Sequence, residues 1–296
     1  MKELTAVVAP GEEGRLDRFL RLRFALPAGR VRSLKFTPGA VLVNGGPARA
    51  DRLLSVGERV TARLPEKASA FEEVSLPLRI LYEDEDILIL DKPAGIAVHG
   101  RSERGDATLG NALAAYLGPE TAFHPVNRLD RETSGAMVIA KNAYAHDRLR
   151  RLLHTPDFIR EYRAVAEGET PDEGTIELPI RRESPDSYRR VCGDGGQMAS
   201  TRFKTLIKGP ERSYVSILPA TGRTHQIRAH FAAIGHPLTG DRLYGTPSPL
   251  IGRTALHSYR IAVTLPWNGK RVEAVAEVGE EITAAFGSDN GCLRQQ

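Results

Sequence analysis

Hydrophobic residues recur at two spacings along this 296-residue chain, and each spacing predicts its own kind of element. Apolar positions three to four apart, with charged residues between them, predict helices over 16–22, 31–36, 111–117, 143–153 and 227–234. Continuous or alternating apolar runs predict strands over 40–45, 58–64, 87–91, 161–166, 201–207, 214–218 and 259–265. Strand runs with a few interspersed helices are typical of an α+β fold, so we expect a mixed, mostly antiparallel sheet with flanking helices.

The same pattern divides the chain into four parts. Residues 11–64 predict a small α/β unit of two short helices and two strands. Residues 65–77 carry Pro, Lys, Ser and paired Glu without periodicity, which is typical of a linker. The main domain is expected over 78–286 and a flexible tail over 287–296.

Charge is concentrated in the small unit. Eleven Lys and Arg residues face five Asp and Glu residues within 11–64, so its net charge is +6, whereas the whole chain carries +4. Such a surface attracts phosphates through a term that depends on salt and not on sequence. A solvated, arginine-rich face explains the charge equally well.

Composition narrows the classes of protein to which the chain can belong. No apolar stretch approaches the ~18 residues that span a bilayer, and the N-terminus lacks the apolar core of a signal peptide. We therefore expect a cytoplasmic protein with no membrane contact, and a monomer. Cys192 and Cys292 have no metal-ligand spacing. A metal hydrolase built on His225, His230, His236 and His257 is disfavoured, because the first two lie five apart, roughly 140° around a helix, and no carboxylate joins them.

Two polar segments stand out. Residues 127–135, Asn-Arg-Leu-Asp-Arg-Glu-Thr-Ser-Gly, place the lone carboxylate Asp130 in a tight turn before the apolar run 136–140. Residues 222–228, Gly-Arg-Thr-His-Gln-Ile-Arg, gather donors next to a glycine. An acid on one side and donors on the other could hold an anionic, polar ligand against the carboxylate. By itself, an aspartate in a turn is usually structural.

Both segments resemble signatures of the RluA-type RNA pseudouridine synthases. Residues 128–135 match every fixed position of the family's Arg-Leu-Asp-x-x-Thr-Ser-Gly loop, with Asn127 where histidine is common, and 222–228 match without substitution. The resemblance implies an isomerase with a catalytic aspartate, Asp130, and no cofactor. It implies that Arg223 pairs with this carboxylate. It also implies that Tyr162 stacks on the uracil and moves the final proton.

The resemblance implies further substrate contacts. Arg128 would fill the space that a flipped nucleotide leaves, and Leu256 would lie under the target base. Other polar residues of the second segment would contact substrate or pack the fold. The substrate-binding candidates are Arg128, Thr224, Gln226, Arg228 and Leu256. Asp130 could attack the sugar, remove a sugar proton or attack the base, and the sequence leaves these roles open.

The basic unit resembles a small RNA-binding module of ribosomal proteins and of many family members. The resemblance lies in residues 15–20, 41–45 and 56–60, although 28–33 lack the usual serine-arginine pair. Its candidate RNA contacts are Arg15, Arg18, Arg30, Arg32 and Lys35. Relatives that carry this module suggest large-subunit ribosomal RNA as substrate, with transfer RNA as the alternative.

Two other classes remain for comparison. A catalytically silent RNA-binding or ribosome assembly factor would need only the basic unit, but the intact Asp130, Tyr162 and Arg223 argue against a loss of activity. A glycosidase would break the same kind of bond, but it needs a second carboxylate that the sequence does not provide.

Overall fold

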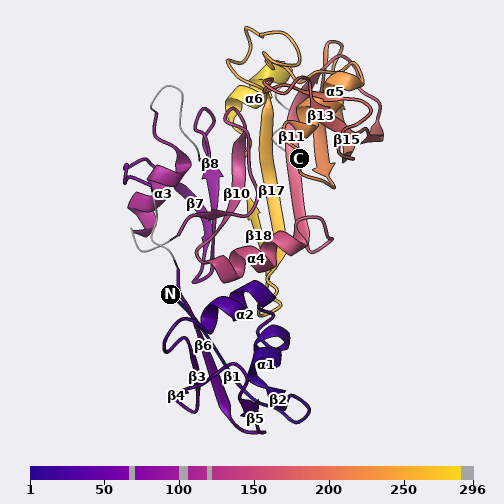
Figure 1. Cartoon of the computed structure of the whole chain (residues 1–296). Coiled ribbons are helices and arrows are strands. Elements are labelled where there is room, and N and C mark those ends of the chain that lie inside the picture. The colour runs from indigo at the N-terminus through magenta and orange to yellow at the C-terminus, as the bar shows by residue number, and fades with distance from the viewer. Residues whose placement is uncertain (67–70, 100–105, 119–121, 288–296) are drawn as a thin grey trace.

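The larger unit of this computed structural model is built on one ten-stranded sheet; the structure describes residues 1–66, 71–99, 106–118 and 122–287. The strand order is β12-β15-β16-β11-β17-β10-β8-β7, with β18 beside β17 and β9 beside β10 (Figure 1). Only the β10–β17 pairing is parallel among these strands, so the expected mixed, mostly antiparallel α+β fold is confirmed. The strands are β7 Arg79–Glu83, β8 Ile87–Lys92, β9 His124–Pro125, β10 Ser134–Ala140, β11 Phe158–Glu167, β12 Glu173–Glu177, β15 Ser200–Lys208, β16 Arg212–Pro219, β17 Leu256–Thr264 and β18 Arg271–Val275.

Helices cover both faces of this sheet, which explains the uninterrupted apolar runs 87–90 of β8 and 136–140 of β10. Alternate residues of these strands, such as Leu88 and Met137, pack with α3 (Leu109–Leu117) and α5 (Gln226–Ala233). The intervening residues, such as Ile89 and Val138, pack with α4 (Ala143–Leu152). A short helix, α6 (Glu280–Phe286), covers β11 and β16. The central strands are therefore rigid supports for the loops at their ends.

The basic N-terminal unit has its own sheet and core. Strands β1 (Lys2–Val7), β6 (Arg59–Leu64), β3 (Val41–Val43) and β4 (Gly46–Pro47) form a four-stranded sheet in that order. Two helices, α1 (Leu16–Leu22) and α2 (Ala28–Leu34), pack on it, and β2 (Gly14–Arg15) pairs with β5 (Leu53–Leu54). The unit starts earlier than the predicted residue 11, because β1 pairs with β6 from Lys2 opposite Leu64.

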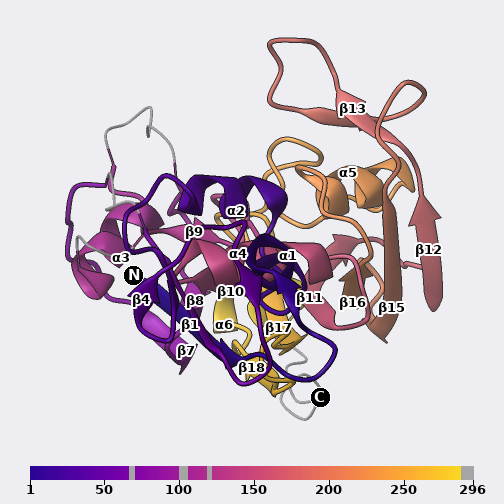
Figure 2. The ribbon, with the colours of Figure 1, turned by 60° about the horizontal axis from the view of Figure 1, so that its bottom comes forward.

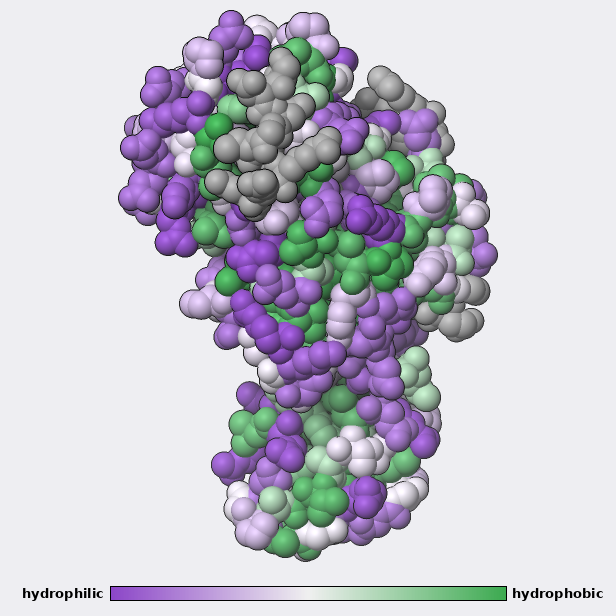
Figure 3. All heavy atoms as spheres, turned by 180° about the vertical axis from the view of Figure 1, so that it is seen from behind, coloured by the Kyte–Doolittle hydropathy of each residue, from purple (hydrophilic) through white to green (hydrophobic). Residues whose placement is uncertain are grey.

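The two units share contacts at α4. Figures 1 and 2 show α2 next to α4, and Figure 3 shows a small lobe below a larger one. Tyr144 of α4 belongs to the apolar core of the N-terminal unit. Lys2 Nζ lies 2.7 Å from an oxygen of the buried Asp86, and Glu66 accepts a hydrogen bond of 3.0 Å from the Ala143 N–H. The N-terminal unit is thus held against the larger unit by apolar and charged contacts.

The connecting and terminal segments differ from the expectation in part. Within the predicted linker 65–77, Glu66 bonds to α4 and Phe71 packs edge-on against Phe123. Residues 67–70 and the tail residues 288–296 lie outside the described residues. The elements that the sequence did not predict include β1, a half-exposed strand with a single partner, and α6, which buries little more than Ile282 and Ala285.

Candidate active site

A cleft of about 920 Å³ lies between the 127–131 loop, β11 and the segment that leads into α5. It brings together residues that are far apart in the sequence. Every residue predicted for catalysis or substrate binding lines it: Arg128, Asp130, Tyr162, Arg223, Thr224, Gln226, Arg228 and Leu256. The predicted contacts of the N-terminal unit lie apart from this cleft, on α1, on α2 and next to them.

The loop that carries Asp130 is held by its backbone. The Thr133 N–H donates to the Asp130 carbonyl at 3.1 Å, which closes the tight turn. The Arg131 carbonyl accepts from the Gly95 N–H at 2.9 Å, and Arg131 Nε returns a bond of 2.7 Å to the Gly95 carbonyl. The Asn127 side chain accepts from the Val138 N–H at 2.8 Å, which ties the start of the loop to β10. The loop is therefore fixed on both sides of the carboxylate.

A buried lysine reinforces this loop. Lys92, at the end of β8, is fully buried, and its ammonium donates to the carbonyls of Pro93, Ile96 and Arg131 at 2.8, 2.9 and 3.1 Å. Burial lowers the pKa of Lys92 to about 8. The three bonds join the turn after β8 to the loop of Asp130. The sequence offered only a strand that ends in Asp-Lys-Pro, so this contact was not predicted.

We expect Lys92→Met to destabilise the fold by roughly 3 kcal/mol at neutral pH, because three backbone carbonyls lose the fully buried ammonium that donates to them. The wild-type pKa lies below that of a lysine in the unfolded chain, so the unfolded state binds more protons between about pH 8 and 10.5. The wild-type stability contribution of Lys92 should therefore rise with pH in that window, by up to roughly 3 kcal/mol. Urea unfolding of both proteins from pH 7 to 10.5 measures it. A constant difference would contradict the burial of a charged lysine.

Gly135 lets β10 approach its parallel neighbour β17 directly after the loop. Its φ is +108°, and a Cβ on it would lie 2.3 Å from the Ser258 carbonyl oxygen.

Ser134, the residue before Gly135, joins β10 to β17 through its side chain. Its Oγ lies 2.8 Å from His257 Nδ1, and His257 Nε2 lies 2.9 Å from the Ala276 carbonyl. Because a carbonyl only accepts, Nε2 carries the proton and Nδ1 accepts from Ser134. Arg253, which is buried, donates to Ser134 Oγ at 2.9 Å and to the Glu132 carbonyl at 3.0 Å.

The partner of Asp130 is Arg228, and the predicted pairing with Arg223 is wrong. Arg228 Nη1 lies 3.4 Å from Asp130 Oδ2, and 28% of the Asp130 side chain is exposed to the cleft. Arg223 Nε instead donates to the Met198 carbonyl at 3.4 Å. The start of α5 lies between the two arginines, at Gln226, so they extend in different directions. The carboxylate thus has a fixed cation on one side and the open cleft on the other.

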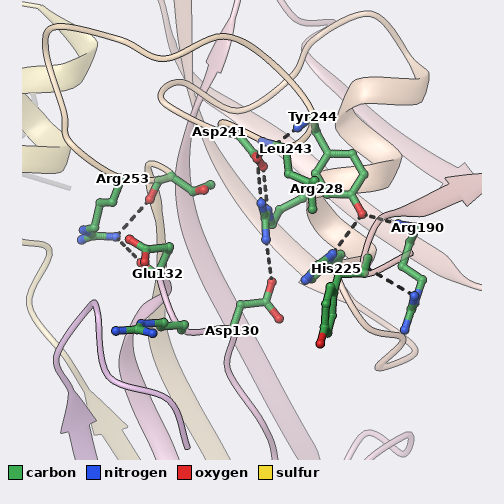
Figure 4. A network of polar contacts seen from close by, with 12 residues as sticks. Asp130, Glu132, Arg190, His225, Arg228, Asp241, Leu243, Tyr244 and Arg253 are labelled. Atoms are coloured by element: carbon green, nitrogen blue, oxygen red, sulfur yellow. Dashed lines mark hydrogen bonds and ion pairs between the residues drawn. The ribbon is translucent and has the colours of Figure 1, made fainter. Parts of the chain in front are cut away.

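Arg228 is itself held by a carboxylate that the sequence analysis missed. Its Nε and Nη2 donate to the two oxygens of the fully buried Asp241 at 2.6 and 2.7 Å, in the planar two-bond geometry that suits a guanidinium (Figure 4). Its guanidinium also lies 5.1 Å from the centre of the Tyr244 ring. The only signal in the sequence is a carboxylate and a tyrosine between Gly240 and Gly245. It does not indicate that Asp241 binds Arg228, which lies in α5.

His225 continues this network. It has a left-handed backbone with φ 56°, which is uncommon for a residue with a Cβ, and its Nδ1 lies 3.0 Å from Tyr244 Oη. Tyr244 Oη accepts from the Arg190 N–H at 2.7 Å, so its own proton is available to His225 Nδ1. Burial lowers the pKa of His225, which favours a neutral ring with its proton on Nε2.

Tyr162 is a buried part of the cleft wall. Only 6% of it is exposed, and it belongs to the apolar core of the sheet. Burial raises the pKa of its phenol, and the charge of Asp130 adds to this while Arg160 opposes it. Tyr162 is therefore protonated at neutral pH. Its hydroxyl can donate a proton or relay one, and it is not a ready phenolate base.

Gln226 lines the cleft, but its side chain does not have the predicted role of contacting the substrate. Its side-chain oxygen accepts from Thr221 Oγ1 at 2.7 Å and from the Arg223 N–H at 2.9 Å. Its amide nitrogen donates to the Ser200 carbonyl at 3.0 Å and to Thr201 Oγ1 at 2.9 Å. The amide is saturated within the protein, so Gln226 holds the 221–226 turn and does not offer a substrate contact.

His230 and His236, two histidines of the disfavoured metal hypothesis, make hydrogen bonds within the fold. His230 is fully buried between Thr201 Oγ1 and the Leu178 carbonyl, at 2.9 and 3.1 Å. His236 Nδ1 lies 2.9 Å from the Glu167 carbonyl. Across the described ranges, no group of three or more His, Cys, Asp or Glu side chains has the geometry of a metal site. None of the helices described here is long and apolar enough to cross a membrane.

Comparisons with known proteins converge on one family. The family model described as RNA pseudouridylate synthase matches residues 86–233. The ribosomal large subunit pseudouridine synthase D of Neisseria meningitidis is 37% identical over 288 residues, which cover 91% of this chain and 77% of the relative. An uncharacterized RNA pseudouridine synthase of Bacillus subtilis, YhcT, is 39% identical over 80% of each chain. The solved structure of human RNA pseudouridylate synthase domain containing 1 superposes with a TM-score of 0.56 at 27% identity, over 68% of this chain and 83% of that one.

Proposed function

This chain belongs to the RluA family of RNA pseudouridine synthases, and we propose that it acts on a uridine of large-subunit ribosomal RNA with Asp130 as its catalytic residue. The observation that supports the residue assignment most is the geometry of the cleft. Asp130 lies in a turn fixed by backbone bonds, faces the cleft and has Arg228 at 3.4 Å. Tyr162 lines the same cleft.

The reaction needs little besides one carboxylate. The bond between the uracil nitrogen and the ribose breaks, the base turns, and a ring carbon bonds to the same sugar carbon. Because the base never leaves, no activated water is required. Asp130 would either attack the sugar, remove a proton from it or attack the base, and each of these steps uses an ionised carboxylate. Arg228 places a cation next to this carboxylate, since its guanidinium contacts Asp130 and is fixed by Asp241.

Tyr162 would supply the last proton movement. After the new carbon–carbon bond forms, the ring carbon still carries a hydrogen that must leave as a proton. The phenol is protonated and buried, so it can accept this proton only while it passes its own to a base, for which the Asp130 carboxylate lies in the same cleft. The ring of Tyr162 also offers a face for the uracil. Leu256, buried at the start of β17, adds an apolar surface to the cleft.

We expect Tyr162→Phe to keep the aromatic surface and to slow the loss of the ring hydrogen by 10²–10⁴-fold, in the range typical for a lost acid–base group. A carbon-linked intermediate should then accumulate. Tyr162→Ala should fail at both stages. Release of tritium from uridine labelled at the ring carbon, followed in parallel with pseudouridine formation, separates the steps. Wild-type activity of Tyr162→Ala would show that this residue is only a sheet tyrosine.

The choice of large-subunit ribosomal RNA rests on two supports. The relative from Neisseria meningitidis is named for that substrate and is matched over most of its length. The N-terminal unit adds a net charge of +6 over residues 11–64, which suits a long, highly charged RNA. Arg18 and Arg32 of this unit are exposed, and no ion pair with either is found among the described residues.

We expect Arg18→Gln/Arg32→Gln to weaken binding to long ribosomal RNA transcripts and to reduce the salt slope of binding by ~1 to 2, because up to two phosphate contacts disappear. Binding to an oligonucleotide too short to reach the N-terminal unit should change much less. Titrations at several salt concentrations measure both slopes. An unchanged slope with long RNA would rule out a phosphate-binding role for these arginines.

Incubation of the purified protein with transcripts tests the function itself. Wild-type protein should form pseudouridine in a large-subunit ribosomal RNA transcript and not in transfer RNA transcripts. Preferred conversion of a transfer RNA would reject the proposed substrate and leave the activity in place. Binding of ribosomal RNA without any conversion would favour a silent assembly factor.

A further inference from the structure

A second cavity of about 390 Å³ adjoins the cleft and is lined in part by the arm formed by β13 (Ile180–Arg182) and β14 (Arg190–Cys192). Figure 2 shows this arm, residues 180–192, extending away from the body of the sheet. No carboxylate lines the cavity. Five arginines do: Arg128, Arg181, Arg182, Arg190 and Arg223. We call it the arginine pocket.

The positive charges of this pocket are not neutralised within the part of the chain that the structure describes. None of the five arginines forms an ion pair there, whereas Arg189 of the same arm lies 2.8 Å from Glu183. Arg182 Nη1 donates to the Pro185 carbonyl at 2.9 Å, and Arg190 Nη1 donates to the Ser187 carbonyl at 3.3 Å. These bonds orient the guanidinium groups without cancelling their charge. Like charges held together repel one another, so a bound anion would stabilise the arrangement.

The arginine pocket and the cleft share a wall. Arg128, Gly222, Arg223 and Thr224 line both cavities, so a chain-like ligand can occupy both at once. We propose that the arginine pocket binds a backbone phosphate of the RNA strand next to the target uridine, while that uridine lies in the cleft at Asp130. The proposal rests on the proposed function. It also gives Arg223, which does not pair with Asp130, a contact with the strand.

The pocket has a fixed position relative to the catalytic carboxylate. The Arg190 N–H donates to Tyr244 Oη at 2.7 Å, and the Tyr244 ring packs on Arg228, the partner of Asp130 (Figure 4). At the base of the arm, Ile180 bridges to Gln197, and a Cβ on Gly196 would come within 2.7 Å of the Ile180 backbone. A phosphate held here would therefore set which nucleotide of the strand reaches Asp130.

The test combines a protein variant with changes in the RNA. Arg182→Gln/Arg190→Gln removes two charges from the arginine pocket and leaves the Arg190 backbone bond intact. Arg202→Gln/Lys204→Gln removes the same charge from exposed positions of the neighbouring strand β15, outside both cavities. The probe is a synthetic stem-loop RNA with unpaired uridines in its loop. In a set of such RNAs, one loop phosphate at a time is replaced by an uncharged methylphosphonate.

We expect the arginine-pocket variant to bind the unmodified RNA about tenfold more weakly than wild type, with a salt slope reduced by ~0.7, because one phosphate contact to a single strand is lost. The control variant should keep a slope near wild type. One methylphosphonate position should weaken wild-type binding and should have no further effect on the arginine-pocket variant. Arg182→Gln alone, with its thermal unfolding, shows whether the loss arises without a folding defect.

Equal losses in the pocket and control variants would overturn the proposal, as would a methylphosphonate effect that persists in the pocket variant. Tight binding of inorganic phosphate that does not compete with the RNA would also overturn it, since the pocket would then serve a free anion. These are binding measurements, so they hold whether or not the RNA is converted. Failure of the proposed function would appear separately, as absent pseudouridine in ribosomal RNA transcripts.

Discussion

Asp130→Asn is expected to lower pseudouridine formation to less than about a thousandth of wild type, while folding and RNA binding change little. The amide keeps the shape of the side chain but removes the negative charge that each proposed role of Asp130 requires. The turn should persist, because it is held through the Asp130 carbonyl, the Arg131 carbonyl and Lys92 and not through the carboxylate. Single-turnover conversion of a ribosomal RNA transcript, with thermal unfolding as the control for folding, measures the effect. Turnover above that level would reject Asp130 as the catalytic residue.

Arg228→Met is expected to have the second largest effect, and it should act on stability as well as on catalysis. It leaves Asp241, which is fully buried, without its cation, and a broken buried ion pair typically costs 3–5 kcal/mol. It also removes the cation next to Asp130. Urea unfolding and single-turnover conversion should both show large losses.

A double variant separates the two effects of Arg228. Arg228→Met/Asp241→Leu removes both buried charges, so part of the lost stability should return. Full recovery is not expected, because Asp241 also accepts from the N–H groups of Leu243 and Tyr244 at 3.0 and 3.2 Å. Conversion should stay low, because Asp130 still lacks its partner. If the double variant regains both stability and activity, Arg228 is a structural residue only.

The sequence predicted the fold class and the place of Asp130 because both leave local signals. The apolar run of 87–91 identifies β8, and the loop before β10 carries its own signature. Elements with weak burial left no comparable signal. β1 alternates half-buried and exposed residues against a single partner, so its apolar pattern is faint. For this reason the sequence predicted a start of the N-terminal unit at residue 11, whereas the unit begins with β1 at Lys2.

The contacts within the site could not be predicted, because they join elements that are distant in the sequence. The segment 222–228 contains two arginines, and nothing local shows which of them faces Asp130. The start of α5 between them decides it. Asp241 and Lys92 come from a loop and a strand end with no recognisable spacing to either signature. Their roles follow from burial, since a buried cation or carboxylate must find its partners nearby.

Pseudouridine mapping in cells tests the central claim most directly. Ribosomal and transfer RNA would be mapped from cells that lack this protein and from the same cells supplied with wild-type protein or Asp130→Asn. The account predicts that one or more pseudouridines of large-subunit ribosomal RNA disappear without the protein, return with wild type and stay absent with Asp130→Asn. Unchanged large-subunit ribosomal RNA, or a site that Asp130→Asn restores, would contradict it.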